Sequence, residues 1–409
     1  MKKGRATVSG TEAAVAPPRK LRMGMVGGGR RSLIGPVHWR ASRLDGGIEL
    51  VAGALSSTPE KSRLSAKDYH IPRERAYDDW EAMLAVERRL RADERMDFVT
   101  IVTPNHLHYR QAGAFVEAGF GVVVDKPMVL TSQEADRLIE LVEAQDVVFA
   151  VTYTYTGYPM VKQAREMVRR GDLGEVRKIV VDYPQDWLRT RLEAEGNKQA
   201  VWRTDPSRAG AGGSIGDIGT HAENLVSTIT GLEIVELCAD LTSFVEGRTL
   251  DDDANVLLRF GNGARGVLMA SQICTGQQNG LNIRVWGTEG GLSWRQEQPN
   301  TLTYWPGDGT MHVLSRGQDN LCTAAERASR LPPGHPEGFI EAFANIYRNV
   351  ADTIRAKKHG REPTSLELDF PTVYEGARGI TFVETVVASS RQGQWISVRR
   401  GRGAKPYGP

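Results

Sequence analysis

Short apolar runs alternate with helical segments through the first 150 residues, and this alternation constrains the fold more than any other feature. The runs that predict strands are Leu21–Val26, Glu49–Leu55, Phe98–Val102, Gly121–Val124 and Val147–Thr152. The segments that predict helices are Pro36–Leu44, Tyr109–Ala118 and Ser132–Ala144. Strands that alternate with helices form a parallel sheet covered on both faces. We therefore predict an α/β domain with a parallel sheet over residues 21–152.

The pattern changes after residue 152, where strands follow one another more closely. After a helix at Tyr158–Arg170, strands are expected at Val176–Tyr183, Ile234–Thr242, Ala254–Phe260, Gly266–Gln272, Leu281–Trp286, Leu292–Trp294 and Leu302–Tyr304. Two terminal helices are expected at Phe339–Lys357 and Tyr374–Ser390. Gly-Asn-Gly at 261–263 predicts a hairpin turn. We predict an α+β domain over residues 153–400 with a large, mostly antiparallel open sheet, a disordered tail at 1–20 and a tail at 401–409.

Composition narrows the class of protein. A length of 409 residues favours two domains. The 52 Lys and Arg against 50 Asp and Glu leave a formal charge of +2, which argues against nucleic acid or an anionic membrane as the main partner. No apolar run approaches the ~18 residues of a membrane span. The 3 cysteines are far apart and indicate no disulfide framework or cysteine-based zinc site. We expect a cytoplasmic protein.

A glycine-rich turn follows the first strand and is typical of dinucleotide binding. Glycine lets backbone N–H groups reach a pyrophosphate at the start of a helix. Gly27 and Gly29 match the usual spacing, Ser32 stands where a third glycine belongs, and Gly35 lies three residues further. We expect an extended loop and a helix that starts near Ile34.

The end of the second strand should meet the adenosine ribose. It carries no carboxylate, and Ser56 with Lys61 could hold a phosphate there. The alternative is that Lys61 is a solvated lysine at a helix start. We predict NAD as the cofactor and leave NADP open.

The third and fourth strands end in polar residues at the edge where a parallel sheet binds ligands. Thr103, Pro104, Asn105 and His108 follow the third strand; the alternative is that Asn105 caps a helix and the histidines lie at the surface. Asp125 and Lys126 follow the fourth strand. Partial burial would lower the pKa of a lysine there and let it polarise or deprotonate a hydroxyl.

The sharpest local signal lies in the second half. Trp202 and Arg203 precede a glycine run at 210–213, and Asp217 and His221 follow at i, i+4 spacing, which on a helix places them on one face. An imidazole has the basicity to take a proton near neutral pH. The pair could also ligate a metal, but no third ligand is suitably spaced, so we predict no metal.

Together these segments resemble the glucose–fructose oxidoreductase / inositol dehydrogenase / MocA family over residues 21–400. The motifs are the glycine turn at 27–35, Thr-Pro-Asn-His-x-His at 103–108, Lys-Pro at 126–127 and Gly-Gly-x-x-x-Asp-x-Gly-x-His at 212–221. The family pattern implies a Rossmann domain, then a sheet domain that supplies the substrate site and an oligomer face, and so a homodimer or homotetramer. It also implies Lys126, Asp217 and His221 as the catalytic trio.

The other predicted site residues complete this interpretation. Beside the glycine turn, Ser56 and Lys61, the cofactor contacts are expected from Thr103, Pro104, Asn105, His108, Asp125 and Trp202. Substrate contacts are expected from Tyr155, Arg203 and Asn224. The chain departs from the family in three ways: Asp125 replaces the usual Glu, the phosphate loop is extended at Arg30–Ile34, and Tyr153 to Gly157 replaces a usual Asn-Arg.

We expect a nicotinamide-dependent enzyme that oxidises a secondary hydroxyl of a carbohydrate: a sugar, a sugar derivative or a cyclitol. His221 would take the hydroxyl proton, Lys126 would stabilise the alkoxide, and Asp217 would bind a neighbouring hydroxyl or orient the group. Cations between Asp186 and Arg208 could bind an anionic substituent, although a solvated loop explains most of them.

Two alternatives remain open. The first is an NAD-dependent glycosidase that oxidises C3 transiently, eliminates the glycosidic group, adds water and reduces the ketone again. The second is a non-catalytic sensor that uses the fold to bind nucleotide and a partner.

Overall fold

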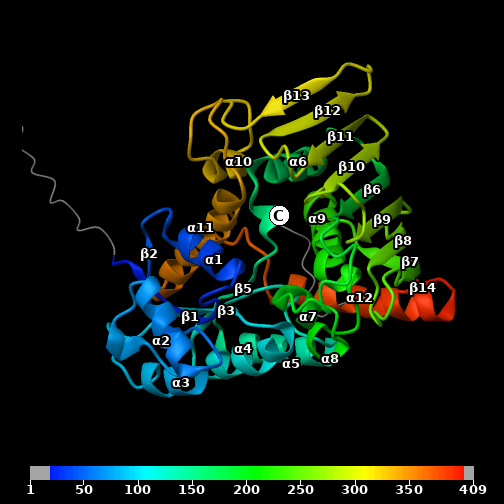
Figure 1. Cartoon of the computed structure of the whole chain (residues 1–409). Helices are drawn as coiled ribbons and strands as arrows, with labels where there is room; N and C mark the ends of the chain where they lie inside the picture. The colour runs from blue at the N-terminus through cyan, green and yellow to red at the C-terminus, as the bar shows by residue number, and fades with distance from the viewer. Residues whose placement is uncertain (1–18, 400–409) are drawn as a thin grey trace, which may run out of the picture.

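The computed structural model describes residues 19–399 and contains two sheets with helices around and between them (Figure 1). The tail predicted at 401–409 lies outside the described residues, as does the tail predicted at 1–20 except for its last two positions. Within residues 19–399, no helix is both long and apolar enough for a transmembrane segment.

The first sheet has five parallel strands in the order β2-β1-β3-β4-β5. They are β1 Leu21–Gly27, β2 Ile48–Ala54, β3 Phe98–Val102, β4 Gly121–Val124 and β5 Phe149–Val151. The central strands are continuous apolar runs because both faces are covered, and every residue of β3 and β4 is buried. The predicted α/β class and all five strands are confirmed.

Helices cover both faces of this sheet. Side chains of α1 (Ile34–Arg43) and α2 (Pro59–Asp68) pack on one face. The other face is covered by α3 (Trp80–Glu87), α4 (His108–Glu117) and α5 (Ser132–Gln145). The parallel strands therefore all end at one edge, and the loops that follow them gather there.

The second sheet has nine strands in the order β13-β12-β11-β10-β6-β9-β8-β7-β14, and only β6 and β9 pair in parallel among those described. The strands are β6 Val176–Pro184, β7 Ile234–Thr242, β8 Asp253–Phe260, β9 Arg265–Ser271, β10 Asn282–Gly287, β11 Gly290–Arg295, β12 Thr301–Pro306, β13 His312–Ser315 and β14 Ile396–Ser397. The mostly antiparallel sheet is confirmed. The hairpin at 261–263 is confirmed too, because Phe260 N donates to Ala264 O at 3.1 Å and Gly263 has φ +90°.

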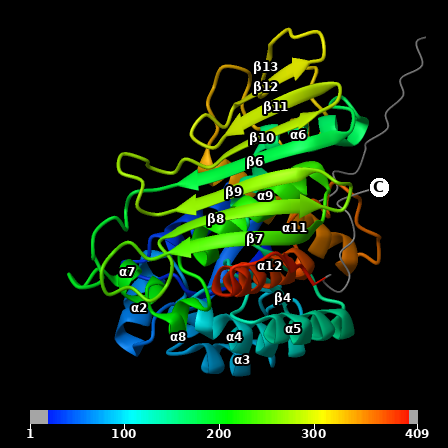
Figure 2. The same ribbon diagram turned by 90° about the vertical axis from the view of Figure 1, so that its right-hand side faces the viewer.

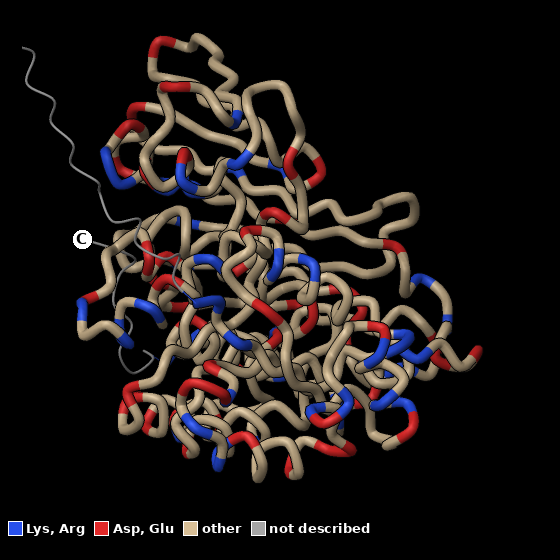
Figure 3. Tube along the Cα trace, turned by 90° about the vertical axis from the view of Figure 1, so that its left-hand side faces the viewer, with Lys and Arg blue, Asp and Glu red and all other residues tan. Residues whose placement is uncertain are grey.

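One face of this sheet packs against α6 (Pro159–Arg170) and α9 (Thr220–Thr230). The other face is not covered by any described helix (Figure 2), and residues along β8 alternate between buried and less buried positions accordingly. Along the Cα trace in Figure 3, Lys and Arg positions are interspersed with Asp and Glu positions. The homodimer or homotetramer stays a prediction.

The two C-terminal helices join the domains. Phe343, Tyr347 and Val350 of α11 (Phe339–Lys358) pack into the same cluster as Met25 and Phe98 of the first sheet. The last helix, α12 (Val373–Gln392), contacts both α5 and β7. The predicted domain boundary at residue 152 assigns α11 to the second domain, although α11 packs on the first sheet. This boundary stays a prediction.

Several short elements were not predicted. They are α2, α3, α7 (Lys198–Arg203), α8 (Pro206–Ala209), α10 (Thr323–Ala328), β13 and β14. Most are brief or charge-rich, so their apolar periodicity is weak. Two of them, α7 and α8, lie beside the functional site.

Candidate active site

A cleft of about 1310 Å³ opens between the ligand edge of the first sheet and the second domain. Its lining includes residues from the loops after β1, β2, β3 and β4, together with residues of α7, of the segment before α9 and of the loops after β6 and before β10. This is the edge at which parallel sheets bind ligands.

The glycine turn forms the first wall. Gly27 and Gly28 have φ of +79° and +73°, and Gly27, Gly29 and Ser32 line the cleft. Gly35 lies behind them in the first turn of α1, where a Cβ would be only 1.9 Å from the carbonyl oxygen of Gly28. The helix therefore packs directly on the turn and begins at Ile34, as predicted.

This wall fits a dinucleotide. In the first turn of α1, Gly35 N donates to Ser32 Oγ at 3.1 Å, while the N-cap residue Leu33 supplies no side-chain hydrogen bond. Leu33 and Ile34 at this helix start line the cleft, where the N-terminus of a helix favours an anion. Ser56, which follows β2, lines the cleft, as do Asp78 and Trp80. Lys61 is not among the described residues that line it, so the structure does not bring this predicted contact to the site.

The loop after β3 divides its predicted residues between the surface and the interior. Thr103 and Pro104 line the cleft, whereas Asn105 and His108 lie behind its wall. Asn105 donates to the carbonyl of Ala209 at 3.2 Å. The ring of His108 lies 2.8 Å from Thr103 O and 2.9 Å from Pro127 O, so it holds the loop after β3 against the loop after β4. The alternative of a cap at Asn105 with surface histidines is wrong for His108, which is buried and starts α4.

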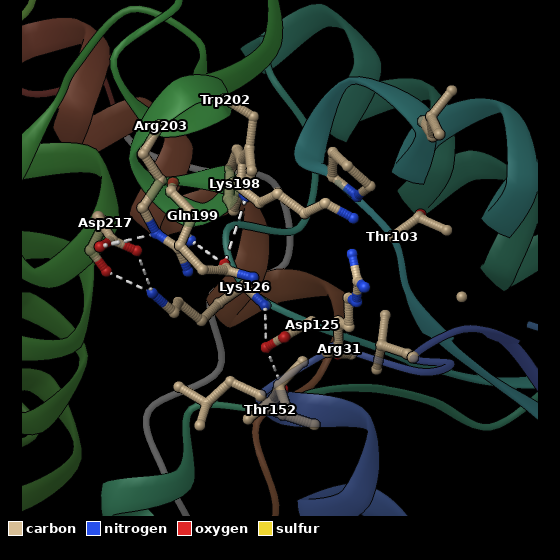
Figure 4. Close-up of a pocket in the computed structure, with 18 of the residues that line it drawn as sticks. Arg31, Thr103, Asp125, Lys126, Thr152, Lys198, Gln199, Trp202, Arg203 and Asp217 are labelled. Atoms are coloured by element: carbon tan, nitrogen blue, oxygen red, sulfur yellow. Dashed lines mark hydrogen bonds and ion pairs between the residues drawn. The ribbon is translucent and has the colours of Figure 1, made fainter. Parts of the chain in front are cut away.

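Lys126 and Asp217 meet in the cleft although 90 residues separate them in the sequence (Figure 4). Lys126 Nζ donates to Asp217 Oδ1 at 2.8 Å and to the Asp217 carbonyl at 2.5 Å. Asp125 Oδ1 accepts from Lys126 N and from Thr152 Oγ1, both at 2.9 Å, and so fixes the turn that presents the lysine. An ion pair in the cleft thus joins the loop after β4 to the far half of the chain.

Asp217 is held by three side chains. Its Oδ2 accepts from Arg203 Nε at 3.2 Å and from Gln272 Nε2 at 2.9 Å, while Oδ1 faces Lys126. Burial alone would raise the pKa of Asp217, but the charges of Lys126 and Arg203 and these hydrogen bonds lower that pKa well below its usual value. The carboxylate therefore stays ionised.

His221 lines the cleft in the first turn of α9, inside a cage of phenol rings. Its ring meets those of Tyr155, Tyr153 and Tyr183 edge-on, at centroid distances of 4.7, 5.7 and 6.3 Å. Burial, and after it the charge of Lys126, lowers the pKa of His221 well below 6.5. The imidazole is therefore neutral at neutral pH and can accept a proton.

The segment between these residues is not a regular α-helix. A π-helical turn, Ile215–Gly219, precedes α9, so the expected i, i+4 face is formed across a wider turn. A Cβ at Gly219 would lie 2.5 Å from Ile215 Cδ1. Asp217 and His221 nevertheless both line the cleft, as the motif predicted.

A second wall of amides and phenols faces the first. Tyr183 OH donates to Asn279 Oδ1 at 2.6 Å, and Gln185 Nε2 donates to the same oxygen at 2.9 Å. Asn279 Nδ2 donates to Tyr155 OH at 3.2 Å, and Gln272 connects Gln185 (3.4 Å) with Asp217. One hydrogen-bonded network thus runs from the Asp217 carboxylate to the phenols around His221.

Sequence reasoning found Tyr155 in this wall but missed Tyr183, Gln185, Gln272 and Asn279. Only their positions at strand ends could have indicated them. They lie at or just after the ends of β6 and β9 and just before β10, and these strand ends meet at one edge of the second sheet. Asn224, predicted to bind substrate, lies buried within α9 rather than among the described lining residues.

Trp202 and Arg203 line the cleft from α7. The guanidinium of Arg203 lies 4.1 Å from the centre of the Trp202 ring and 5.8 Å from that of Trp187. Stacking between two indoles restrains the arginine whose Nε contacts Asp217. Both positions are therefore at the site, as predicted.

Comparison with protein families gives two adjacent matches. Residues 21–153 match a family model described as an oxidoreductase family with an NAD-binding Rossmann fold. Residues 161–293 match the GFO/IDH/MocA C-terminal domain.

Three relatives span most of the chain. An oxidoreductase of Bacillus subtilis, YfiI, described as uncharacterized, is 34% identical and covers 93% of this chain and 98% of its own. The levoglucosan dehydrogenase of Pseudarthrobacter phenanthrenivorans is 27% identical over 69% of this chain and 76% of its own. A crystal structure of an inositol dehydrogenase homolog from Azotobacter vinelandii with NAD+ is 34% identical, covers 93% and 97% of the two chains and superposes with a TM-score of 0.89.

The Azotobacter vinelandii homolog has also been crystallised with NADH and myo-inositol. In that complex it is 33% identical, covers 93% of this chain and 98% of its own, and has a TM-score of 0.86.

Proposed function

The chain belongs to the GFO/IDH/MocA family of NAD-dependent oxidoreductases, and on this premise we propose that it oxidises a secondary hydroxyl of a neutral sugar or cyclitol. The observation that carries the proposal is the meeting of Lys126, Asp217 and His221 at one cleft whose opposite wall is built from uncharged amides and phenols. The names of two relatives support this class, since one is a levoglucosan dehydrogenase and the other has been crystallised with myo-inositol.

His221 is the proposed general base. A neutral imidazole that lines the cleft can take the proton of the reacting hydroxyl, and its lowered pKa keeps it in that form. The bound cofactor, NAD, would supply the hydride acceptor for the carbon that carries this hydroxyl.

Lys126 is the proposed stabiliser of the alkoxide. An ammonium that donates toward the developing negative oxygen favours the transition state over the ground state. Asp217 keeps this ammonium aimed into the cleft, because its Oδ1 and its own carbonyl both accept from Nζ.

The second wall explains the choice of a neutral polyol. The Asp217 carboxylate is shared by two cations, and the wall formed by Tyr155, Tyr183, Gln185 and Asn279 carries hydrogen-bonding groups without charge. Amides and phenols can each donate and accept, which suits hydroxyl groups that do both. Trp187 and Trp202 also line the cleft, and their apolar rings suit the C–H side of a sugar.

A screen of cyclitols, pyranoses and sugar acids with NAD+ tests the proposal by following NADH formation. We expect turnover with at least one neutral polyol and less with its carboxylate analogue. Oxidation of sugar acids alone would contradict the neutral class. Release of an aglycone from glycosides without NADH accumulation would instead identify the glycosidase reaction.

A further inference from the structure

The cations of the cleft fall into two groups. Six arginine or lysine side chains line it, and half of them have no carboxylate within ion-pair distance in the described part of the chain. The paired ones are Arg30, Lys126 and Arg203. The unpaired ones are Arg31, Lys198 and Arg208. Unpaired cations that line a common cleft favour an anion within it.

Arg31 and Lys198 line the cleft from different domains. Arg31 lies in the glycine loop between β1 and α1 and has φ +69°, a left-handed conformation that is uncommon for a residue with a side chain. Lys198 is the first residue of α7 in the second domain. Figure 4 shows their charged ends pointing toward one another across the cleft that both line. Because like charges repel, this arrangement favours a negative group between them.

We propose that Arg31 and Lys198 close on the pyrophosphate of NAD from opposite sides, which makes Lys198 a cofactor-binding residue of the second domain. Arg31 lies in the loop that leads to the N-terminus of α1, the place where a Rossmann fold receives the pyrophosphate. The amide and phenol wall, where we place the substrate, is formed by other residues, among them Gln185 and Asn279.

The segment that carries Lys198 also reaches the catalytic centre. Residues 197–209, here called the strap, run between Gly196 and Gly210, whose φ values are +77° and +103°. Asn105 ties the end of the strap to the first domain by donating to Ala209 O. Arg203, on the same short helix as Lys198, contacts Asp217. Pyrophosphate bound at Lys198 would therefore hold the arginine that orients the catalytic carboxylate.

NADH binding to the full chain without substrate tests the proposal, measured by calorimetry and by quenching of tryptophan fluorescence. We expect Lys198→Gln and Arg31→Gln each to weaken NADH about tenfold and ADP-ribose, which keeps the pyrophosphate, by the same factor. Lys198→Arg should restore most of the affinity. Lys67→Gln, an exposed lysine on α2 that is not among the lining residues, is the matched control and should leave NADH affinity unchanged.

Three outcomes would overturn the proposal. One is NADH affinity of Lys198→Gln within twofold of wild type. The second is a loss for NADPH but not for NADH, which would assign Lys198 to a 2′-phosphate. The third is unchanged NADH affinity with a raised KM for an anionic substrate, which would assign it to the substrate. Because substrate is absent from the binding measurement, failure of the proposed polyol oxidation leaves this test intact.

Discussion

The two walls of the cleft are built in different ways. The first wall is backbone: glycines packed so tightly that a Cβ at Gly35 would strike the carbonyl of Gly28. The second wall is a network of side chains, Tyr155, Tyr183, Gln185 and Asn279, joined by hydrogen bonds. A backbone wall recognises a group common to every nucleotide, whereas a side-chain wall can be changed residue by residue. We infer that most side-chain substitutions at this site would change substrate binding and leave cofactor binding intact.

The largest effect is expected where the two walls meet. Lys126→Ala should lower kcat about 10²-fold or more, because the alkoxide loses its charged donor, while the Kd for NADH changes little. Steady-state kinetics and NADH titration measure the two quantities on the same preparation. Turnover near the wild-type rate would exclude Lys126 from the catalytic trio.

A methyl group on the backbone wall should damage cofactor binding. Gly35→Ala places a Cβ 1.9 Å from Gly28 O, and overpacking of this kind typically lowers folding stability by ~1–3 kcal/mol. The turn and the helix start must move apart to relieve the clash, so we expect NADH to bind roughly tenfold or more weakly at the displaced turn. Gly113→Ala in α4 is the control, because its Cβ would meet Leu141 at an ordinary 3.7 Å. Equal NADH affinity in both variants would show that the glycine turn accommodates the added methyl group. The first wall would then be no more rigid than the second.

A substitution in the side-chain wall should weaken substrate binding and leave cofactor binding unchanged. Asn279→Ala removes the oxygen that accepts from Tyr183 and Gln185, so we expect the substrate KM to rise about tenfold while NADH affinity is unchanged. Asn255→Ala, exposed on β8, serves as the control and should alter neither. A change in NADH affinity as large as the change in KM would mean that the two walls are not separable.

The smallest effect concerns pH. The pKa of His221 is lowered by burial, so the base remains neutral as pH falls through 6.5 and accepts protons only in more acid solution. We expect kcat/KM for oxidation to change less than about twofold between pH 8 and 6.5 from this group. An acid limb with its midpoint at or above pH 6.5 would contradict the assignment of His221 as a buried base.

The contrast between the walls also explains what the sequence could predict. The turn after β1, the start of α1 and the position of Lys126 follow from local patterns of apolar runs, glycines and strand ends. Gln185, Gln272 and Asn279 belong to no local pattern, since three different strands bring them together. The π-helical turn before α9 depends on packing around Gly219 and could not be read from spacing.

Helices with weak apolar periodicity were a second source of error. Pro59–Asp68 and Trp80–Glu87 have weak apolar periodicity and were not predicted, although α2 and α3 cover opposite faces of the first sheet. The placement of α11 was equally hidden, because its apolar face shows that it packs but not on which sheet.

That placement has a consequence for synthesis. The face of the first sheet that carries Met25 and Phe98 is covered in part by Phe343, Tyr347 and Val350 of α11, which the ribosome makes almost two hundred residues after β5 ends. A nascent chain that stops before α11 exposes these apolar side chains to water. The nucleotide-binding domain is therefore completed late in synthesis. A fragment that ends near residue 152 would lack α11 and would leave one apolar face of its sheet partly exposed.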